Sequence, residues 1–307
     1  MAAEALIFEM APGWNPSTED HWRRSLLTHA DWLASKPVDQ VDTDDVLKVV
    51  RPYWKAGDAG RKLRQRIESL LDYAAVKGWR DGELRNPARL KGHMDRLLPK
   101  QTRKVKHHPA LPYQDMPGFM ADLAEKTESS ARALEWTIYT VAREGQTLLA
   151  TQAEVSDGVW TCPGAHMKGQ GSPDFRVPLT AQALASRQTL IIGEPKPDAL
   201  LFPGQQGKPM SGRTMDLLVK RMVGEKAVPH GFRSTFRDWA YEETDHPREI
   251  VEAALAHVFG DATERAYKRG EALRKRRLLL TDWANFIRPL PAGEEAPSEQ
   301  SPSDHPV

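Results

Sequence analysis

The chain is 307 residues long, 40% of them are hydrophobic, and its formal net charge is +1. This length allows two domains with separate cores, and nine tryptophans argue against disorder over most of the chain. A single cysteine, Cys162, excludes an internal disulfide framework and indicates a reducing compartment. No apolar run approaches the roughly 18 residues that span a bilayer, and the first residues lack a secretory signal. We therefore expect a soluble cytoplasmic protein with no membrane partner.

The charged residues are distributed unevenly. The segment 289–307 carries four acids and no lysine or arginine, so the rest of the chain has a net charge of +5. Basic residues cluster between residues 89 and 106 and between 268 and 277. Such local patches favour a polyanionic partner even when the total charge is near zero.

Residues 14–98 predict an all-α domain, preceded by a short apolar N-terminal arm at 1–13. Ser17 fits the N-cap of the first helix, and a second helix is expected to stop near Pro52. In a third helix apolar residues recur at a spacing of 3.6. Its opposite face carries four candidate contacts to a polyanion: Arg61, Lys62, Arg64 and Arg66.

A basic, proline-containing linker is expected at 99–111. Its cations are Lys100, Arg103, Lys104 and Lys106. They fit a solvated tether and, equally well, a strap that follows a phosphate backbone between two domains.

Residues 112–288 predict a second domain that is mainly helical with a small antiparallel sheet. Three short strands are expected near 155, 159–161 and 175–179, because the apolar period changes there and glycines separate the segments. Lys168 falls in the turn between the second and third strands. The proline- and glutamate-rich tail 289–307 is expected to be disordered.

Four residues with polar chemistry follow in the stretch 229–269. Pro229 is suited to open a helix with His230 and Arg233 on its first turn, where free amides and the helix dipole favour a phosphate. His257 ends the next helix, and Tyr267 lies on a further one, along which Lys268, Arg269 and the basic run 274–277 continue. Taken singly, each also fits an ordinary surface or packing residue.

The sequence contains no glycine-rich nucleotide loop, no C-x-x-C pair and no H-E-x-x-H pattern. We therefore expect no metal and no cofactor.

Taken in order, Arg143, Lys168, His230, Arg233, His257 and Tyr267 resemble the catalytic set of the tyrosine recombinases, the phage integrase family. Their successive gaps are 25, 62, 3, 24 and 10 residues. The strings A-R-E-G-Q, M-K-G, H-G-F-R-S-T-F-R-D-W-A and L-A-H-V-F-G-D-A-T-E-R-A-Y carry the match, and the last two are similar to the prophage and genomic-island branch. The resemblance covers about 14–287 and implies a helical core-binding domain followed by the catalytic domain.

Two features depart from that branch. It usually has an additional N-terminal arm-binding domain, to which no segment of this chain is similar. Gln146 stands where the family often has a glutamate, so a supporting hydrogen bond beside Arg143 is in doubt.

The resemblance implies a site-specific recombinase that joins DNA to Tyr267 through a 3′-phosphotyrosyl link. Arg143 and Arg233 would clamp the phosphate, both histidines would assist, and Lys168 would be the general acid. Its partners would be double-stranded DNA sites, other copies in a tetramer formed on DNA from free monomers, and an accessory DNA-bending or directionality factor. Alternatives are a catalytically silent DNA-binding relative and a type IB topoisomerase-like enzyme.

Overall fold

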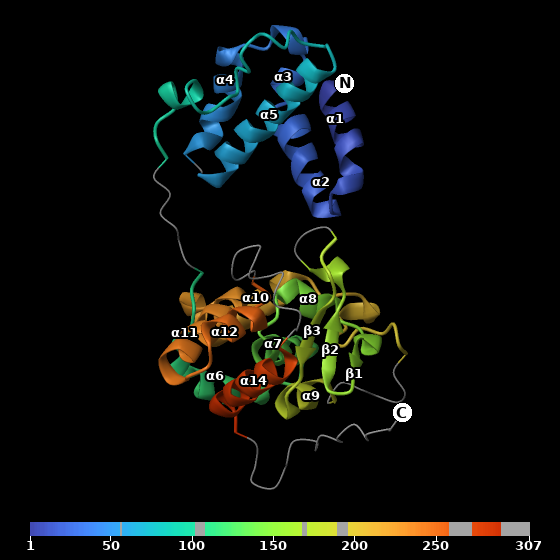
Figure 1. Cartoon of the computed structure of the whole chain (residues 1–307), viewed down its shortest axis with the longest axis vertical. Helices are drawn as coiled ribbons and strands as arrows, with labels where there is room; N and C mark the ends of the chain where they lie inside the picture. The colour runs from blue at the N-terminus through green and yellow to red at the C-terminus, as the bar shows by residue number, and fades with distance from the viewer. Residues whose placement is uncertain (56, 102–107, 168–170, 189–195, 258–271, 290–307) are drawn as a thin grey trace, which may run out of the picture. The chain divides into compact units, whose positions relative to one another are not determined.

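The computed structural model describes residues 1–55, 57–101, 108–167, 171–188, 196–257 and 272–289. They fall into two compact units, Met1–Lys106 and His107–Val307 (Figure 1). The first unit is helical, and the second combines helices with a three-stranded sheet. The predicted fold class is confirmed.

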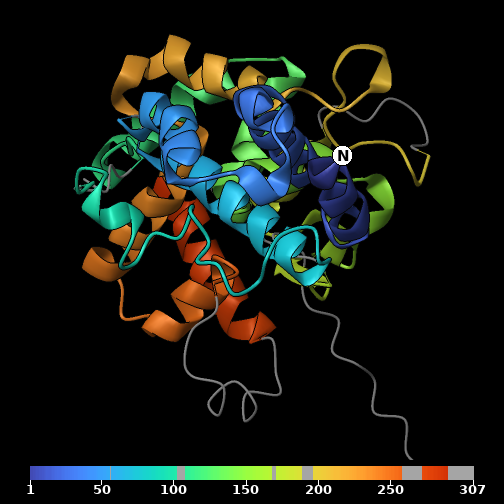
Figure 2. The same cartoon turned by 90° about the horizontal axis from the view of Figure 1, so that it is seen from above.

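The N-terminal unit packs its helices around one apolar core, and Figure 2 shows these helices in blue and cyan from above. Its elements are α1 (Ala2–Met10), α2 (Pro16–Arg23), a π-helical turn (Arg24–His29), α3 (Asp31–Ala34), α4 (Thr43–Trp54) and α5 (Asp58–Val76). The stretch expected as an N-terminal arm is α1, which contacts α5 and buries Leu6 and Ile7. No helix among the described residues is long and apolar enough to cross a membrane.

Two helix boundaries differ from the sequence-based expectation. Asn15, not Ser17, caps α2, because its side chain accepts a hydrogen bond from the Thr18 amide at 2.8 Å. Helix α4 continues through Pro52 to Trp54. A proline in the last turn costs only one main-chain hydrogen bond, and Trp54, 6% exposed, anchors that turn in the core.

The C-terminal unit has a mixed architecture. Its helices are α6 (Met116–Ala124), α7 (Ser129–Thr140), α8 (Glu144–Leu149), α9 (Ala181–Gln188), α10 (Gly212–Val223), α11 (Phe232–Glu243), α12 (Arg248–Ala254) and α14 (Leu273–Ile287). The strands β1 (Val155–Ser156), β2 (Val159–Cys162) and β3 (Phe175–Pro178) form an antiparallel sheet in the order β1-β2-β3. The expected strands are confirmed, and Trp160 pairs with Val177 in the register.

Helix α14 connects the sheet to the helices that carry the candidate site. It contacts β3, α6, α7 and α12 (red in Figure 1). Its fully buried Trp283 packs on Phe236 and Trp239 of α11, at ring-centroid distances of 5.5 and 5.0 Å, and donates a hydrogen bond to the Ile138 carbonyl at 3.0 Å. These contacts fix α11 and α7 relative to each other.

The basic run 274–277 belongs to α14, which begins after Ala272. Ala272, its N-cap, has a left-handed backbone (φ 50°), so α14 starts after this residue. Arg276 is 2% exposed and lies over the Phe175 ring, while Arg277 donates to the carbonyls of Leu179 and Gly158. Part of this run therefore holds α14 on the sheet instead of forming a solvated face.

Candidate active site

Arg233 is the buried centre of the candidate site. It lies on the first turn of α11 and is 6% exposed. Its guanidinium donates to the carbonyl oxygens of Val141 and Leu255, the latter at 2.5 Å, and lies 3.2 Å from Nε2 of His257. These contacts use three of the five N–H donors of an arginine. Within the described structure two remain for an anion.

Two residues with left-handed backbones direct carbonyl groups at the arginines. Val141 (φ 48°) ends α7, and its oxygen accepts from Arg233. Ala256 (φ 49°) follows α12, and its oxygen accepts from Nη2 of Arg143 at 3.4 Å. Residues other than glycine adopt this conformation at a cost and only where the surroundings impose it. Here the chain turns sharply and presents acceptors to both guanidinium groups.

His257 is oriented by a carboxylate of α12. This helix ends at Ala254 and not at His257 as expected, because the left-handed backbone of Ala256 turns the chain away from the helix. Its Nδ1 lies 2.7 Å from Oε2 of Glu252, whose side chain is 11% exposed. With Nδ1–H donating to Glu252, Nε2 is the acceptor that faces Arg233. Glu252 was not among the predicted residues. An acid five positions before the histidine is the only sequence signal for it, and that spacing alone is weak.

Arg143 is placed by the turn between α7 and α8. Its main-chain N–H donates to Oε1 of the buried Gln146 at 2.7 Å. Nε2 of Gln146 is thereby directed at Sδ of Met167, the residue before Lys168 in the sequence. Gln146 therefore makes a hydrogen bond beside Arg143, although glutamine in place of the usual glutamate had placed such a bond in doubt.

We expect Gln146→Leu to lower the free energy of unfolding by about 1–3 kcal/mol, because the partly buried Arg143 amide loses its acceptor. Urea titration of both proteins measures this difference. Gln65→Leu, on the exposed face of α5, is the matched control and should change stability little. Equal loss in the two variants would contradict the assigned hydrogen bond.

His230 lies beside this cluster, at the turn Pro229–Gly231 that leads into α11. The pKa of His230 is lowered, first because surrounding protein desolvates the ring and then because Arg233, His108, Arg143 and His257 add positive charge. Burial, assisted by Arg143, lowers the pKa of Arg233 to about 10. At neutral pH the site therefore combines charged guanidinium groups with a histidine that favours its neutral form.

Glu144, at the start of α8, gives the fold a pH dependence. Burial and repulsion by Asp216 raise the pKa of its carboxyl group from 4.5 to about 7. Between these values the folded state binds more protons than the unfolded state, so stability falls as pH rises.

After discounting for partial exposure, we expect Glu144→Gln to stabilise the fold by about 1 kcal/mol at pH 8 and hardly at all at pH 5. Thermal unfolding at both pH values measures this, with the exposed Glu83→Gln as control. A pH-independent gain would contradict it.

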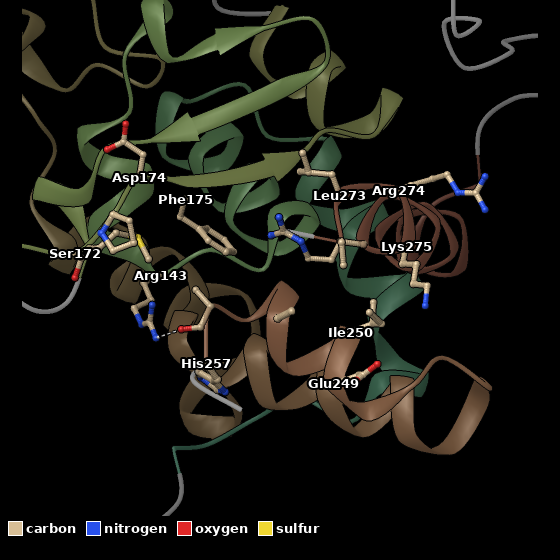
Figure 3. A pocket seen from close by; sticks show the side chains of 16 residues that line it. Arg143, Ser172, Asp174, Phe175, Glu249, Ile250, His257, Leu273, Arg274 and Lys275 are labelled. Atoms are coloured by element: carbon tan, nitrogen blue, oxygen red, sulfur yellow. Dashed lines mark hydrogen bonds between the residues drawn. The ribbon is translucent and has the colours of Figure 1, made fainter. Parts of the chain in front are cut away.

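A cavity of about 1090 Å³ opens beside Arg143 and His257 (Figure 3). Met167, Phe175, Ile250 and Leu273 supply apolar parts of its wall. His257 and Ala272, the described residues on either side of 258–271, both line it.

Four of the six predicted catalytic residues lie in the described structure and form one cluster: Arg143, His230, Arg233 and His257. Of these, Arg143 and His257 line the cavity. Lys168 and Tyr267 lie outside the described residues. No group of three metal-ligating side chains occurs among those described.

The predicted DNA contacts have mixed surroundings. Lys62 and Lys100 are exposed. Arg61 pairs with Asp58, and Arg66 donates to the carbonyl of His21. Arg64 is 7% exposed and donates to the Ala88 carbonyl at 2.7 Å, so it lies in the interior and not on the expected outer face. The other five lie outside the described residues: Arg103, Lys104, Lys106, Lys268 and Arg269.

Family models match both units. The phage integrase central domain matches residues 1–93, and the phage integrase family model matches residues 111–273. The chain belongs to the phage integrase family of tyrosine recombinases.

Two curated relatives extend over most of the chain. It is 27% identical to prophage integrase IntA of Escherichia coli strain K12 over 90% of its own length, and 26% identical to the integrase of Enterobacteria phage P4 over 92%. The chain spans 66% and 70% of those relatives, respectively.

Solved structures of other integrases share the fold. A lambda integrase dimer bound to a COC′ core site superposes with a TM-score of 0.60 at 15% identity, covering 84% of this chain and 94% of that one. The Tn1549 transposon integrase in complex with a circular intermediate DNA gives a TM-score of 0.62 at 13% identity, covering 93% and 94%.

Proposed function

We propose that the protein is a site-specific DNA recombinase that cleaves and rejoins DNA through a 3′-phosphotyrosyl intermediate at Tyr267, without metal or ATP. The convergence of Arg143, Arg233, His230 and His257 from separate elements carries this proposal. Two guanidinium groups and two imidazoles in one cluster suit a phosphodiester better than any other common substrate.

The arginines bind the non-bridging oxygens of the scissile phosphate. Arg233 is already fixed by the carbonyls of Val141 and Leu255, so little reorganisation is needed when negative charge develops in the pentacoordinate transition state. Arg143, held by Gln146 and Ala256, provides the second clamp. Their guanidinium forks match phosphate geometry, which a lysine ammonium does not.

The histidines serve proton transfer and hydrogen bonding. A phenol with a pKa near 10 is a poor nucleophile until its proton has an acceptor. His230, whose pKa is lowered, supplies a neutral imidazole for that proton. His257 is held by Glu252 with Nε2 on the side of Arg233, where it supports the phosphate-binding guanidinium.

Tyr267 and Lys168 complete the reaction in this proposal. Tyr267 is five residues from Ala272 at the cavity, which limits its distance from that rim to about 17 Å of extended chain. Its oxygen bonds to phosphorus while the bond to the 5′-oxygen breaks, and Lys168 protonates that leaving oxygen. One phosphodiester replaces another, so the reverse step joins a new strand without an external energy source.

The partners follow from the charge distribution and the relatives. Lys62, Lys100 and the linker cations would contact DNA phosphates, giving an affinity that falls steeply with salt. Lambda integrase forms a tetramer bound to a Holliday junction, and we propose a tetramer on DNA here, with monomers in free solution. The protein would act in the cytoplasm, at the nucleoid. An accessory factor that bends DNA or sets the direction of recombination would act with it.

A two-site plasmid assay tests the proposal. DNA flanking the gene supplies the sites, and recombinant junctions are detected by sequencing. We expect junctions only when both sites are present. Relaxation of a plasmid without junctions would favour a topoisomerase-like enzyme, and binding without cleavage would favour a silent DNA-binding relative.

A further inference from the structure

The segment just before α6 is fastened to the start of α11. The Pro109 carbonyl accepts a hydrogen bond from the Val228 amide at 3.2 Å, and the Leu111 carbonyl accepts from Oγ1 of Thr235 at 2.6 Å. Leu111 is 5% exposed. Residues 108–112 are thus a fixed part of the C-terminal unit, beside the turn that carries His230.

Gly231 allows this close approach. A Cβ atom built on Gly231 would lie 2.0 Å from the Pro109 oxygen, well inside any real contact. A side chain at 231 would push the segment away from α11. The glycine between His230 and Phe232 therefore brings the backbone of residues 108–112 against the candidate site.

This arrangement places the ring of His108 on the ring of His230. Their centroids are 4.8 Å apart and their planes make an angle of 68°, an edge-on aromatic geometry. His108 was expected only as part of a linker. The contact gives it a defined partner in the catalytic set.

We propose that His108 is a positioning residue for His230: it fixes the plane of the His230 imidazole and adds a second imidazole to the ring of cations around it. This role rests on the proposed function, in which neutral His230 accepts the proton of Tyr267. Among the described residues, the charged and titratable groups that face His230 are those of Arg233, Arg143, His257 and His108 itself. Charge on His108 repels charge on His230, and its ring excludes water from the same side.

The direction in which the His230 pKa changes follows from the charge of His108 and from the water that its ring excludes. Both lower the pKa of His230, so replacing His108 raises it. Because the neutral ring is the active form, the acid limb of the cleavage rate against pH moves to higher pH. His108→Phe keeps an aromatic edge and removes the charge, whereas His108→Ala removes both.

The experiment measures covalent adduct formation on nicked DNA from pH 5 to 8, at saturating DNA, for the full chain. In His108→Phe we expect the acid limb to shift upward with the plateau rate retained. In His108→Ala we expect a larger upward shift, because the ring is lost as well as the charge, and a plateau about 3- to 10-fold lower. That loss is less than the 10²-fold or greater loss typical when an acid–base group itself is removed. His246→Phe, in the loop between α11 and α12 and paired with Asp282, is the matched control.

A histidine NMR titration in the absence of DNA tests, independently of activity, whether His108 lowers the pKa of His230. The His230 signal, assigned by its loss in His230→Gln, should titrate at higher pH in His108→Phe than in wild type. An unchanged His230 titration would overturn the inference, even if DNA affinity fell. A wild-type protein that forms no adduct would contradict the proposed function alone, because the NMR result would still test the His108 contact.

Discussion

Arg233→Lys is expected to lower the rate of DNA cleavage by about 10³-fold while the affinity for DNA stays within a few-fold of wild type. Loss of one preorganised hydrogen-bond donor typically lowers a catalytic rate by about 10²- to 10³-fold. Lysine also lacks the planar guanidinium group. A lysine cannot contact the Val141 and Leu255 carbonyls and also present further N–H groups to a phosphate. Single-turnover cleavage of nicked DNA, with a gel-shift titration alongside, measures both quantities.

Arg132→Lys provides the matched control. Arg132 is also buried and also donates to main-chain carbonyls, those of Leu123, Ala124 and Lys126, but it lies outside the site. Both variants should lose stability, and only Arg233→Lys should lose cleavage at a temperature where both remain folded. If cleavage falls in both variants, and only as far as each loses stability, then Arg233 has a structural role and not a catalytic one.

Tyr267→Phe is expected to abolish covalent attachment and strand joining completely, because no other phenol is proposed to reach the phosphate. The change removes one oxygen, so the stability of the fold and the affinity for DNA should be retained. Adduct formation after denaturation, together with a gel-shift titration, tests this. Tyr241→Phe is the control, since Tyr241 is 83% exposed on α11 and should react as wild type does. A covalent adduct that still forms in Tyr267→Phe would mean that another residue is the nucleophile.

The sequence predicts the fold class because its local patterns agree with the final packing. The strand near 155 and the glycine-separated strands at 159–161 and 175–179 all occur as expected. Helix ends were less predictable. Pro52 stays inside α4 because burial of Trp54 outweighs one lost hydrogen bond, and local sequence does not report that burial.

The candidate site was predictable only in part. Arg143, His230, Arg233 and His257 are recognisable as an ordered set, and the structure brings them together. The groups that hold them were not predicted, because they act through tertiary contacts. The Val141 and Ala256 carbonyls depend on left-handed turns, which residues other than glycine do not announce in a sequence.

The surface cations show the same limit. Arg64 and Arg66 differ by only two positions on α5, yet Arg64 is buried against the Ala88 carbonyl. The pattern of one helix cannot show that a loop 24 residues further along the chain folds over that helix. Burial of Arg64 and Arg276 shows that a basic run alone does not identify a DNA-binding surface.

The covalent link to DNA tests the central claim most directly. Wild-type protein is incubated with a nicked duplex from the DNA flanking its gene, denatured, and digested with protease, and the DNA-bound peptide is sequenced by mass spectrometry. The account predicts one peptide, linked to the 3′ end of the cleaved strand through Tyr267. A protein that binds this DNA without forming a link, or one linked through another residue, would contradict it.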